Sequence, residues 1–135
     1  MDSTNFSDLE RRLDSHYSQE DLAVLKKAYD FAKTAHEGQL RATGEPYFVH
    51  SFSVGLKLAD LKLPSSVIAS GMLHDVPEDT VFTTEDVERE FGKDIGSMVA
   101  AITKLGHVKY RGEQRYIENL RKMFVAMAED VRVVF

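Results

Sequence analysis

The chain lacks cysteine entirely. This absence excludes disulfide bonds, zinc–thiolate sites and thiol catalysis. Long hydrophobic runs are also missing, since none approaches the roughly 20 apolar residues that a membrane-spanning helix needs. The first residues, Met-Asp-Ser-Thr-Asn-Phe, are polar and acidic and do not resemble a secretory signal. Together these absences favour a cytoplasmic protein that makes no membrane contact.

The chain also has fewer basic than acidic residues. The chain carries 17 basic and 22 acidic residues, for a formal net charge of −5, and the basic residues are scattered. Direct nucleic-acid binding is therefore disfavoured, because it usually needs a basic face. A small phosphorylated ligand remains possible if a divalent metal and a few local basic residues supply positive field. The length of 135 residues suits a single domain with one core.

Apolar residues recur at helical spacing along most of the chain. A short amphipathic helix is expected before Asp14, and a longer one between Ser18, which forms a capping-box pattern with Asp21, and Gly38. Further helices are predicted at residues 48–61, 65–75, 83–92, 93–105 and 117–130, with loops at 39–47 and 106–112. The β-branched segment 131–135 has no partner strand and is interpreted as the start of another helix. The expected class is all-α, an irregular helical bundle.

Residues 69–80 concentrate the chemistry of the chain. His74 and Asp75 end an apolar helix, and Glu78 and Asp79 follow at once. Pro77 disfavours helical geometry at the residue before it, so the helix is predicted to end near Asp75, with the second acidic pair on the turn beyond. If a metal ion binds here, Asp75 would be a ligand, and Glu78 and Asp79 would lie just outside the ligand shell.

A second imidazole, His50, lies a helix and a loop before His74. With Asp75 these residues form a plausible mixed nitrogen and oxygen site for Mn, Fe, Zn or Mg-like ions. A metal held there could polarise a phosphoryl oxygen and activate water, so hydrolysis of a phosphate ester or anhydride is the natural reaction. By residue type alone, a hydrogen-bonded core histidine and a solvated acidic pair are the competing interpretations.

The remaining histidines are interpreted as structural. His36 lies on the apolar stripe of its predicted helix, which favours a satisfied core residue over a ligand. His16 and His107 lie in polar surroundings and are expected at the surface.

Longer strings carry a family resemblance. Ala35-His-Glu-Gly-Gln-Leu-Arg-Ala-Thr-Gly-Glu-Pro-Tyr-Phe-Val-His50 resembles the opening signature of the hydrolase domain of RelA/SpoT-type stringent-response proteins, where R-x-S/T-G-E-P-Y leads to a metal-binding histidine. Leu73-His-Asp-Val-Pro-Glu-Asp-Thr80 resembles the same family's His-Asp and Glu-Asp-Thr motif. Phe91-Gly92, Thr103-Lys-Leu105 and residues 118–134 fit in the same order, so the resemblance covers nearly the whole chain from Leu22 onward.

The resemblance implies an HD-superfamily helical domain over residues 1–135 that removes the 3′-pyrophosphate from (p)ppGpp with Mn²⁺, giving GDP or GTP and pyrophosphate. It implies that three residues are metal ligands, namely His50, His74 and Asp75. It further implies that Glu78 and Asp79 orient or deprotonate the attacking water.

The same resemblance implies a set of nucleotide contacts. Arg41 would lie against the guanine base, where a guanidinium plane can stack. Thr43 and Asn119 would sit near the nucleotide. Lys104 is a basic position within a family motif, for which substrate binding and ordinary salt bridging on a helix surface are both open.

Four departures from the family pattern bear on activity. Ala42 stands where the family often has lysine, Ser51 replaces a usual proline, and Pro77 replaces a usual apolar residue. The fourth departure is at Phe135, where the chain stops before a Lys-Leu-Ala-Asp-Arg segment whose aspartate is the last metal ligand of the family. The expectation is an N-terminal fragment, cut before the last helices, with weak metal affinity, little turnover and possible self-association through the exposed end. The parent protein would also carry a synthetase domain.

Two alternatives to the hydrolase interpretation remain. One is a non-catalytic regulatory HD domain of a (p)ppGpp synthetase, which is disfavoured because the predicted ligands and acidic pair are all present. The other is an HD phosphohydrolase that acts on another nucleotide. Arg41 and its Gly-Glu-Pro-Tyr loop argue against that alternative, since they belong to guanine-side recognition in the resemblance.

Overall fold

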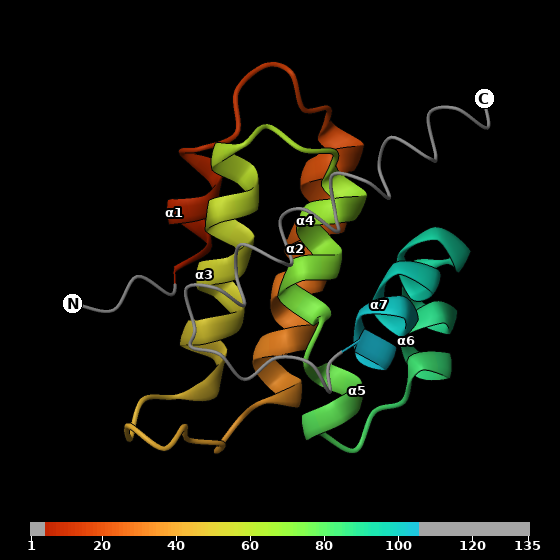
Figure 1. Ribbon diagram of the computed structural model, residues 1–135. Helices are drawn as coiled ribbons and strands as arrows, with labels where there is room; N and C mark the ends of the chain where they lie inside the picture. The colour runs from red at the N-terminus through yellow and green to blue at the C-terminus, as the bar shows by residue number, and fades with distance from the viewer. Residues whose placement is uncertain (1–4, 106–135) are drawn as a thin grey trace.

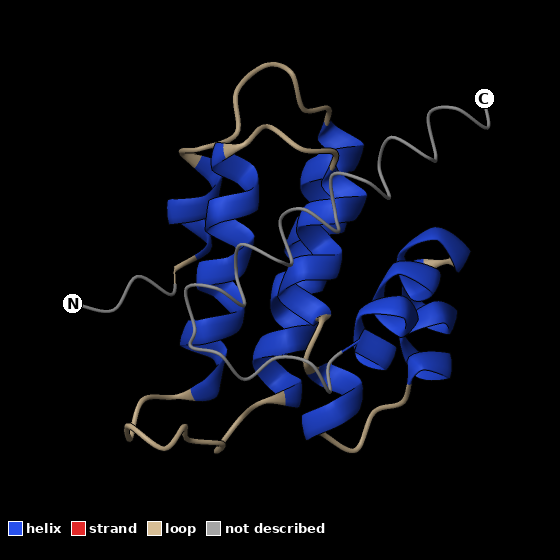
Figure 2. Ribbon diagram, in the orientation of Figure 1, coloured by secondary structure: helices blue, strands red, loops and turns tan. Residues whose placement is uncertain are grey.

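The computed structural model describes residues 5–105 of the chain, with side-chain burial for residues 5–101. Within these residues it contains helices and loops but no strand, apart from an isolated bridge between Leu40 and Pro46 (Figure 2). The helices are α1 (Phe6–Glu10), α2 (Gln19–Ala35), α3 (Tyr47–Asp60), α4 (Ser65–Leu73), α5 (Val76–Asp79), α6 (Thr84–Phe91) and α7 (Lys93–Leu105). The predicted all-α class is confirmed. The helix and loop predicted beyond residue 105, together with His107 and Asn119, lie outside the described residues.

Helix α4 is the centre of the bundle and packs against α2, α3 and α7 (Figure 1). All of its residues from Val67 to Leu73 are buried, as expected of a helix that is apolar around its whole circumference. Two glycines let α3 and α4 approach closely. A Cβ at Gly55 would lie 2.5 Å from Met72 Cγ, and a Cβ at Gly71 would overlap Leu58 Cδ1.

Capping boxes start two of the helices where the sequence places them. The Ser18 hydroxyl accepts from the backbone of Asp21, whose carboxylate accepts from the backbone of Ser18. Thr83 and Asp86 repeat the arrangement before α6. Caps of this kind stabilise a helix by about 1 kcal/mol each. In both boxes the backbone hydrogen bond is the main cause that lowers the pKa of the aspartate.

The prediction for the end of the central helix is wrong in one respect. Helix α4 ends at Leu73, His74 and Asp75 form the turn, and Val76 begins the short helix α5. Pro77 lies in the first turn of α5. Proline is tolerated there because the first amides of a helix have no intrahelical acceptor. The acidic pair Glu78 and Asp79 therefore stands in the short helix α5, whereas the prediction placed it on a turn.

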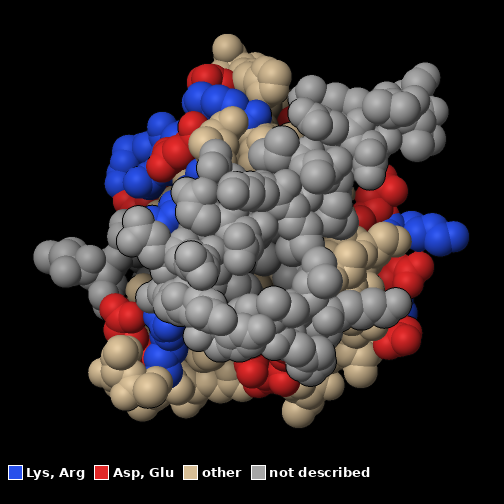
Figure 3. Space-filling model, viewed as in Figure 1, with Lys and Arg blue, Asp and Glu red and all other residues tan. Residues whose placement is uncertain are grey.

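The described surface carries charges of both signs. On the face drawn in Figure 3, lysine and arginine atoms of described residues lie beside aspartate and glutamate atoms rather than in separate patches. None of the helices in the described residues is long and apolar enough to span a membrane.

Candidate metal centre

Three helices meet where the predicted ligands lie. His50 belongs to the first turns of α3, His74 caps the end of α4, and Asp75 precedes α5. One donor atom from each lies within 4.8 Å of the others. All three are buried, with exposed fractions of 5%, 1% and 1%. The structure thus brings together the two imidazoles and the carboxylate that the sequence nominates.

The closest contacts in this cluster converge on one oxygen, Asp75 Oδ2. His74 Nε2 lies 3.1 Å from it and His50 Nε2 lies 3.6 Å from it. His74 Nδ1 donates to the Gly71 carbonyl oxygen at 2.6 Å, and since a carbonyl only accepts, Nδ1 must carry a proton. In the neutral ring the Nε2 lone pair then faces a carboxylate oxygen. A divalent cation between them resolves that repulsion, so the donor set fits a metal.

Asp75 also belongs to a second cluster, which is made of three carboxylates. Oxygen atoms of Asp75, Glu78 and Asp79 also lie within 4.8 Å of one another. Asp75 is buried, whereas Asp79 is exposed on α5. Asp75 therefore belongs both to the buried cluster and to an acidic group that opens toward solvent. The assigned roles of these residues stay predictions, but their placement suits a metal with acid–base groups beside it.

Tyr47 is a site residue that the sequence reasoning missed. Its hydroxyl donates to Asp79 Oδ2 at 2.9 Å and to Asp75 Oδ2 at 3.1 Å. Burial, followed by the negative charge of Asp75 and the hydrogen bond to Asp79, raises the pKa of Tyr47, so the hydroxyl stays protonated as a donor. Its spacing from His50 was the available signal, because residues three positions apart on a helix share one face.

The loop before α3 is tied to the same turn. The Gln39 side-chain amide donates to the Asp79 carbonyl oxygen, and its amide oxygen pairs with His36 Nδ1 at 2.9 Å. The loop closes on itself where the Arg41 amide donates to the Glu45 carbonyl at 2.8 Å. Thr43, between these residues, is exposed.

This arrangement ties the start of the loop to α5 through Gln39. Nucleotide contacts of Arg41 and Thr43 stay predictions. Lys104 belongs to α7, but its side chain, like the whole of Asn119, lies outside what the structure describes.

His16 follows its prediction, and His36 follows its prediction only in part, since it is a core residue but not a fully hydrogen-bonded one. His36 is 2% exposed and stacks on the Tyr47 ring at 4.9 Å between centroids. It lies in the core beside the metal cluster without belonging to it, and its Nε2 has no hydrogen-bond partner within the described part of the chain. His16 is exposed.

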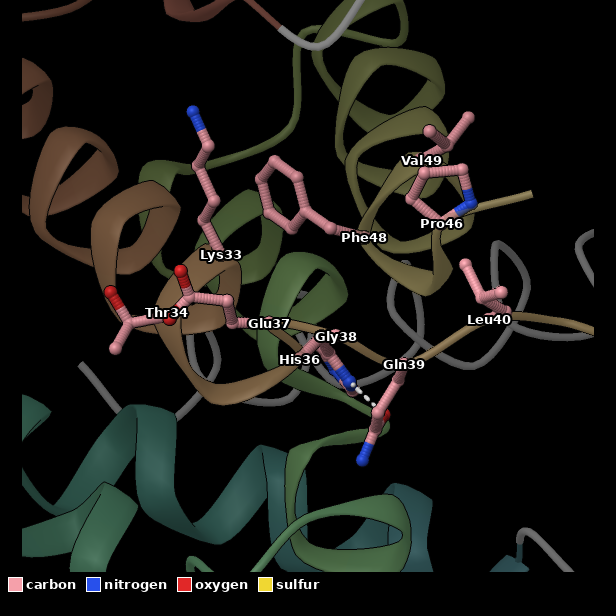
Figure 4. Close-up of a pocket in the computed structure, with 10 residues that line it drawn as sticks. All are labelled: Lys33, Thr34, His36, Glu37, Gly38, Gln39, Leu40, Pro46, Phe48 and Val49. Carbon is pink, nitrogen blue, oxygen red and sulfur yellow. Dashed lines mark hydrogen bonds between the residues drawn. The ribbon is translucent and has the colours of Figure 1, made fainter. Parts of the chain in front are cut away.

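A pocket of about 500 Å³ lies on the outer side of this loop. Its walls come from the end of α2, the loop and the start of α3, with the Phe48 ring and the Lys33 chain facing the cavity (Figure 4). Two of its lining residues also contact the site, since His36 stacks on Tyr47 and Gln39 donates to the Asp79 carbonyl. None of the three candidate ligands lines the pocket.

The helical bundle and its buried His, His-Asp cluster define a candidate divalent-metal site of the HD type. Residues 28–135 match the family model described as HD domain, and the chain belongs to that family.

Named relatives agree with this assignment. The chain is 45% identical over 127 residues to a guanosine-3′,5′-bis(diphosphate) 3′-pyrophosphohydrolase of Aquifex aeolicus, covering 94% of this chain and 18% of that protein. It is 38% identical to the bifunctional (p)ppGpp synthase/hydrolase SpoT of Escherichia coli, covering 96% of this chain and 18% of that protein. It is also 38% identical to a GTP pyrophosphokinase of Myxococcus xanthus, covering 98% of this chain and 19% of that protein. The chain thus spans about a fifth of the length of these relatives.

Proposed function

We propose that this chain is a Mn²⁺-dependent pyrophosphohydrolase domain, located in the cytoplasm, that removes the 3′-pyrophosphate of (p)ppGpp. The observation that carries the proposal is the double membership of Asp75, which joins a buried two-histidine cluster to the acidic residues of α5. The names of the relatives support the substrate. We propose that residues 1–135 form one HD domain. We further propose that the natural protein carries a synthetase domain elsewhere in its chain.

The residues of the chain supply separate parts of the reaction. His50, His74 and Asp75 would hold the cation, which supplies Lewis acidity to the phosphoryl group and to the attacking water. Glu78 and Asp79 stand beside Asp75 and would orient that water and accept its proton. The loop that carries Arg41 would hold the guanosine portion, since a guanidinium can stack on a base and face anionic groups. Substrate specificity would then come from the loop and reactivity from the turn that it contacts.

A second candidate function follows from the relative named GTP pyrophosphokinase. A domain that serves a synthetase could regulate it without turnover. The geometry favours catalysis, because a regulatory copy has no need to gather two imidazoles at the buried carboxylate of Asp75 and two further carboxylates beside it. Such buried polar groups are costly to fold unless they are paired or bind a cation.

The test is Mn²⁺-dependent release of pyrophosphate from ppGpp by the complete natural chain. We expect His74→Ala to lower kcat by about 100-fold or more, and Glu78→Gln to lower it by about 100-fold while Mn²⁺ binding persists. His16→Ala is the matched control, since this imidazole is exposed beyond the opposite end of α2. Circular dichroism establishes that each variant keeps its helices.

The outcomes separate the two roles. Wild-type turnover in His74→Ala contradicts the metal mechanism. Wild-type turnover in Glu78→Gln removes only the proposed proton acceptor. Tight Mn²⁺ binding without hydrolysis by the unmodified chain favours the regulatory function.

A further inference from the structure

Tyr47 connects the metal cluster with the acidic turn. It is the first residue of α3, and its hydroxyl reaches two aspartates that lie 28 and 32 residues later in the chain. Its ring is fixed on one face by the stacked imidazole of His36, with centroids 4.9 Å apart and planes inclined by 20°. The edge-to-face contact with His50, at 6.0 Å, holds it from another side. The hydroxyl therefore points at the carboxylates from a ring with little freedom to rotate away.

The hydroxyl has one proton and two carboxylate acceptors. At 2.9 Å from Asp79 and 3.1 Å from Asp75, it shares that proton between them. The Asp75 acceptor is the oxygen that faces both His74 Nε2 and His50 Nε2. A cation held by this cluster would take up a lone pair of that same oxygen and weaken it as an acceptor. The Tyr47 hydrogen bond would then shift toward Asp79, which is already the nearer acceptor.

We propose that Tyr47 is a positioning residue that couples the metal cluster to Asp79. With the cation in place, its hydroxyl donates to Asp79 and holds that carboxylate beside the cluster, where its negative charge favours the cation and its oxygen faces the attacking water. The consequence for turnover rests on the proposed function. The consequence for metal affinity rests on the geometry of the chain alone.

The backbone of the same turn is held by a contact that does not use the Tyr47 hydroxyl. The Gln39 amide donates to the Asp79 carbonyl oxygen, so α5 keeps its place when the tyrosine hydroxyl is removed. Tyr47→Phe therefore deletes the hydrogen bond to the carboxylates and leaves the ring stack and the loop contact. The variant changes the orientation of a side chain rather than the position of a helix.

The experiment is calorimetric Mn²⁺ titration of the complete natural chain, followed by ppGpp hydrolysis, for Tyr47→Phe, Asp79→Asn and the double variant. Partners of metal ligands typically change affinity or activity by about 10- to 100-fold when removed. We expect Tyr47→Phe to weaken Mn²⁺ binding by about 10-fold and to lower kcat with KM unchanged. The double variant should bind Mn²⁺ no more weakly than Asp79→Asn, because coupled residues are not additive.

Tyr17→Phe is the matched control. This tyrosine is also largely buried, and its hydroxyl donates to the Leu63 carbonyl at 2.8 Å beyond the other end of α2. It should retain Mn²⁺ affinity and kcat.

Each result decides the proposal. Wild-type Mn²⁺ affinity in Tyr47→Phe overturns it, and so do additive losses in the double variant. If Tyr47→Phe fails to fold, wild-type Mn²⁺ affinity in Asp79→Asn overturns the proposal, because this exposed substitution must weaken Mn²⁺ binding if the carboxylate is held at the cluster. If the unmodified chain hydrolyses no ppGpp, the proposed function fails while the titrations still test Tyr47.

Discussion

At each end of the bundle a tyrosine hydroxyl donates a hydrogen bond to a distant part of the chain, but the two tyrosines have different kinds of acceptor. At the far end, formed by residues 11–18 and 61–64, the Tyr17 hydroxyl donates to the neutral carbonyl of Leu63. At the site end, formed by residues 36–46 and 74–79, the Tyr47 hydroxyl donates to two carboxylates. Helix α2 separates these ends (Figure 1). The same side chain thus serves as a structural tie at one end and as part of a polar cluster at the other.

Charges are also arranged differently at the two ends. Arg12 pairs with Asp60 at 2.9 Å, and Lys62 with Asp14 at 3.1 Å, all with side chains between 38% and 56% exposed. Exposed pairs of this kind contribute about 0 to 1 kcal/mol. At the site end His50, His74 and Asp75 are nearly inaccessible, although Glu78 and Asp79 are exposed. Removing a carboxylate such as that of Asp75 from water is strongly unfavourable unless it gains a partner. The far end therefore tolerates its charges, whereas the site end needs a cation to stabilise them.

The largest expected effect follows from this need. On the proposed function, Mn²⁺ at roughly 100 times its Kd should raise the free energy of unfolding by about 2.7 kcal/mol, the value for a ligand that binds the folded state and not the unfolded one. Thermal unfolding with and without Mn²⁺ measures the shift. His74→Ala should abolish it, whereas Asp60→Ala at the far end should keep it. An equal shift in His74→Ala would place the bound ion away from the cluster.

A somewhat smaller effect is expected where α3 and α4 touch between the two ends. In Gly71→Ala the new methyl group overlaps Leu58 Cδ1 and lies 3.3 Å from Val54 Cγ1. Overpacking of this kind destabilises a core by about 1 to 3 kcal/mol, to be measured by chemical denaturation. Because the Gly71 carbonyl accepts from His74, Mn²⁺ affinity should fall as well. Lys57→Ala, an exposed change on α3, is the control and should leave both quantities unaltered.

Local patterns predicted most of the fold correctly. Ser18 with Asp21, and Thr83 with Asp86, place the starts of α2 and α6, because a capping box is complete within four residues. Apolar spacing likewise placed α3 and α7. Pro77 misled because the rule for proline inside a helix was applied to a residue in the first turn of a new helix.

The candidate site was less accessible to sequence reasoning. His74 and Asp75 are adjacent, His50 was nominated with them by residue type, and the family resemblance then supported all three as ligands. The role of Tyr47 depends on contacts with residues 28 and 32 positions away, which no local pattern encodes. The close approach at Gly55 and Gly71 is equally non-local, since it depends on how two helices cross.

The smallest expected effect tests the far end itself. Asp60→Ala removes the exposed partner of Arg12, and the free energy of unfolding should change by less than about 1 kcal/mol. Salt screens such pairs, so the difference between wild type and variant should shrink further at high ionic strength in denaturant titrations. A larger, salt-independent loss would show that this pair is coupled to the core. The two ends would then differ in the chemistry of their charged groups but not in how much those groups contribute to the free energy of unfolding.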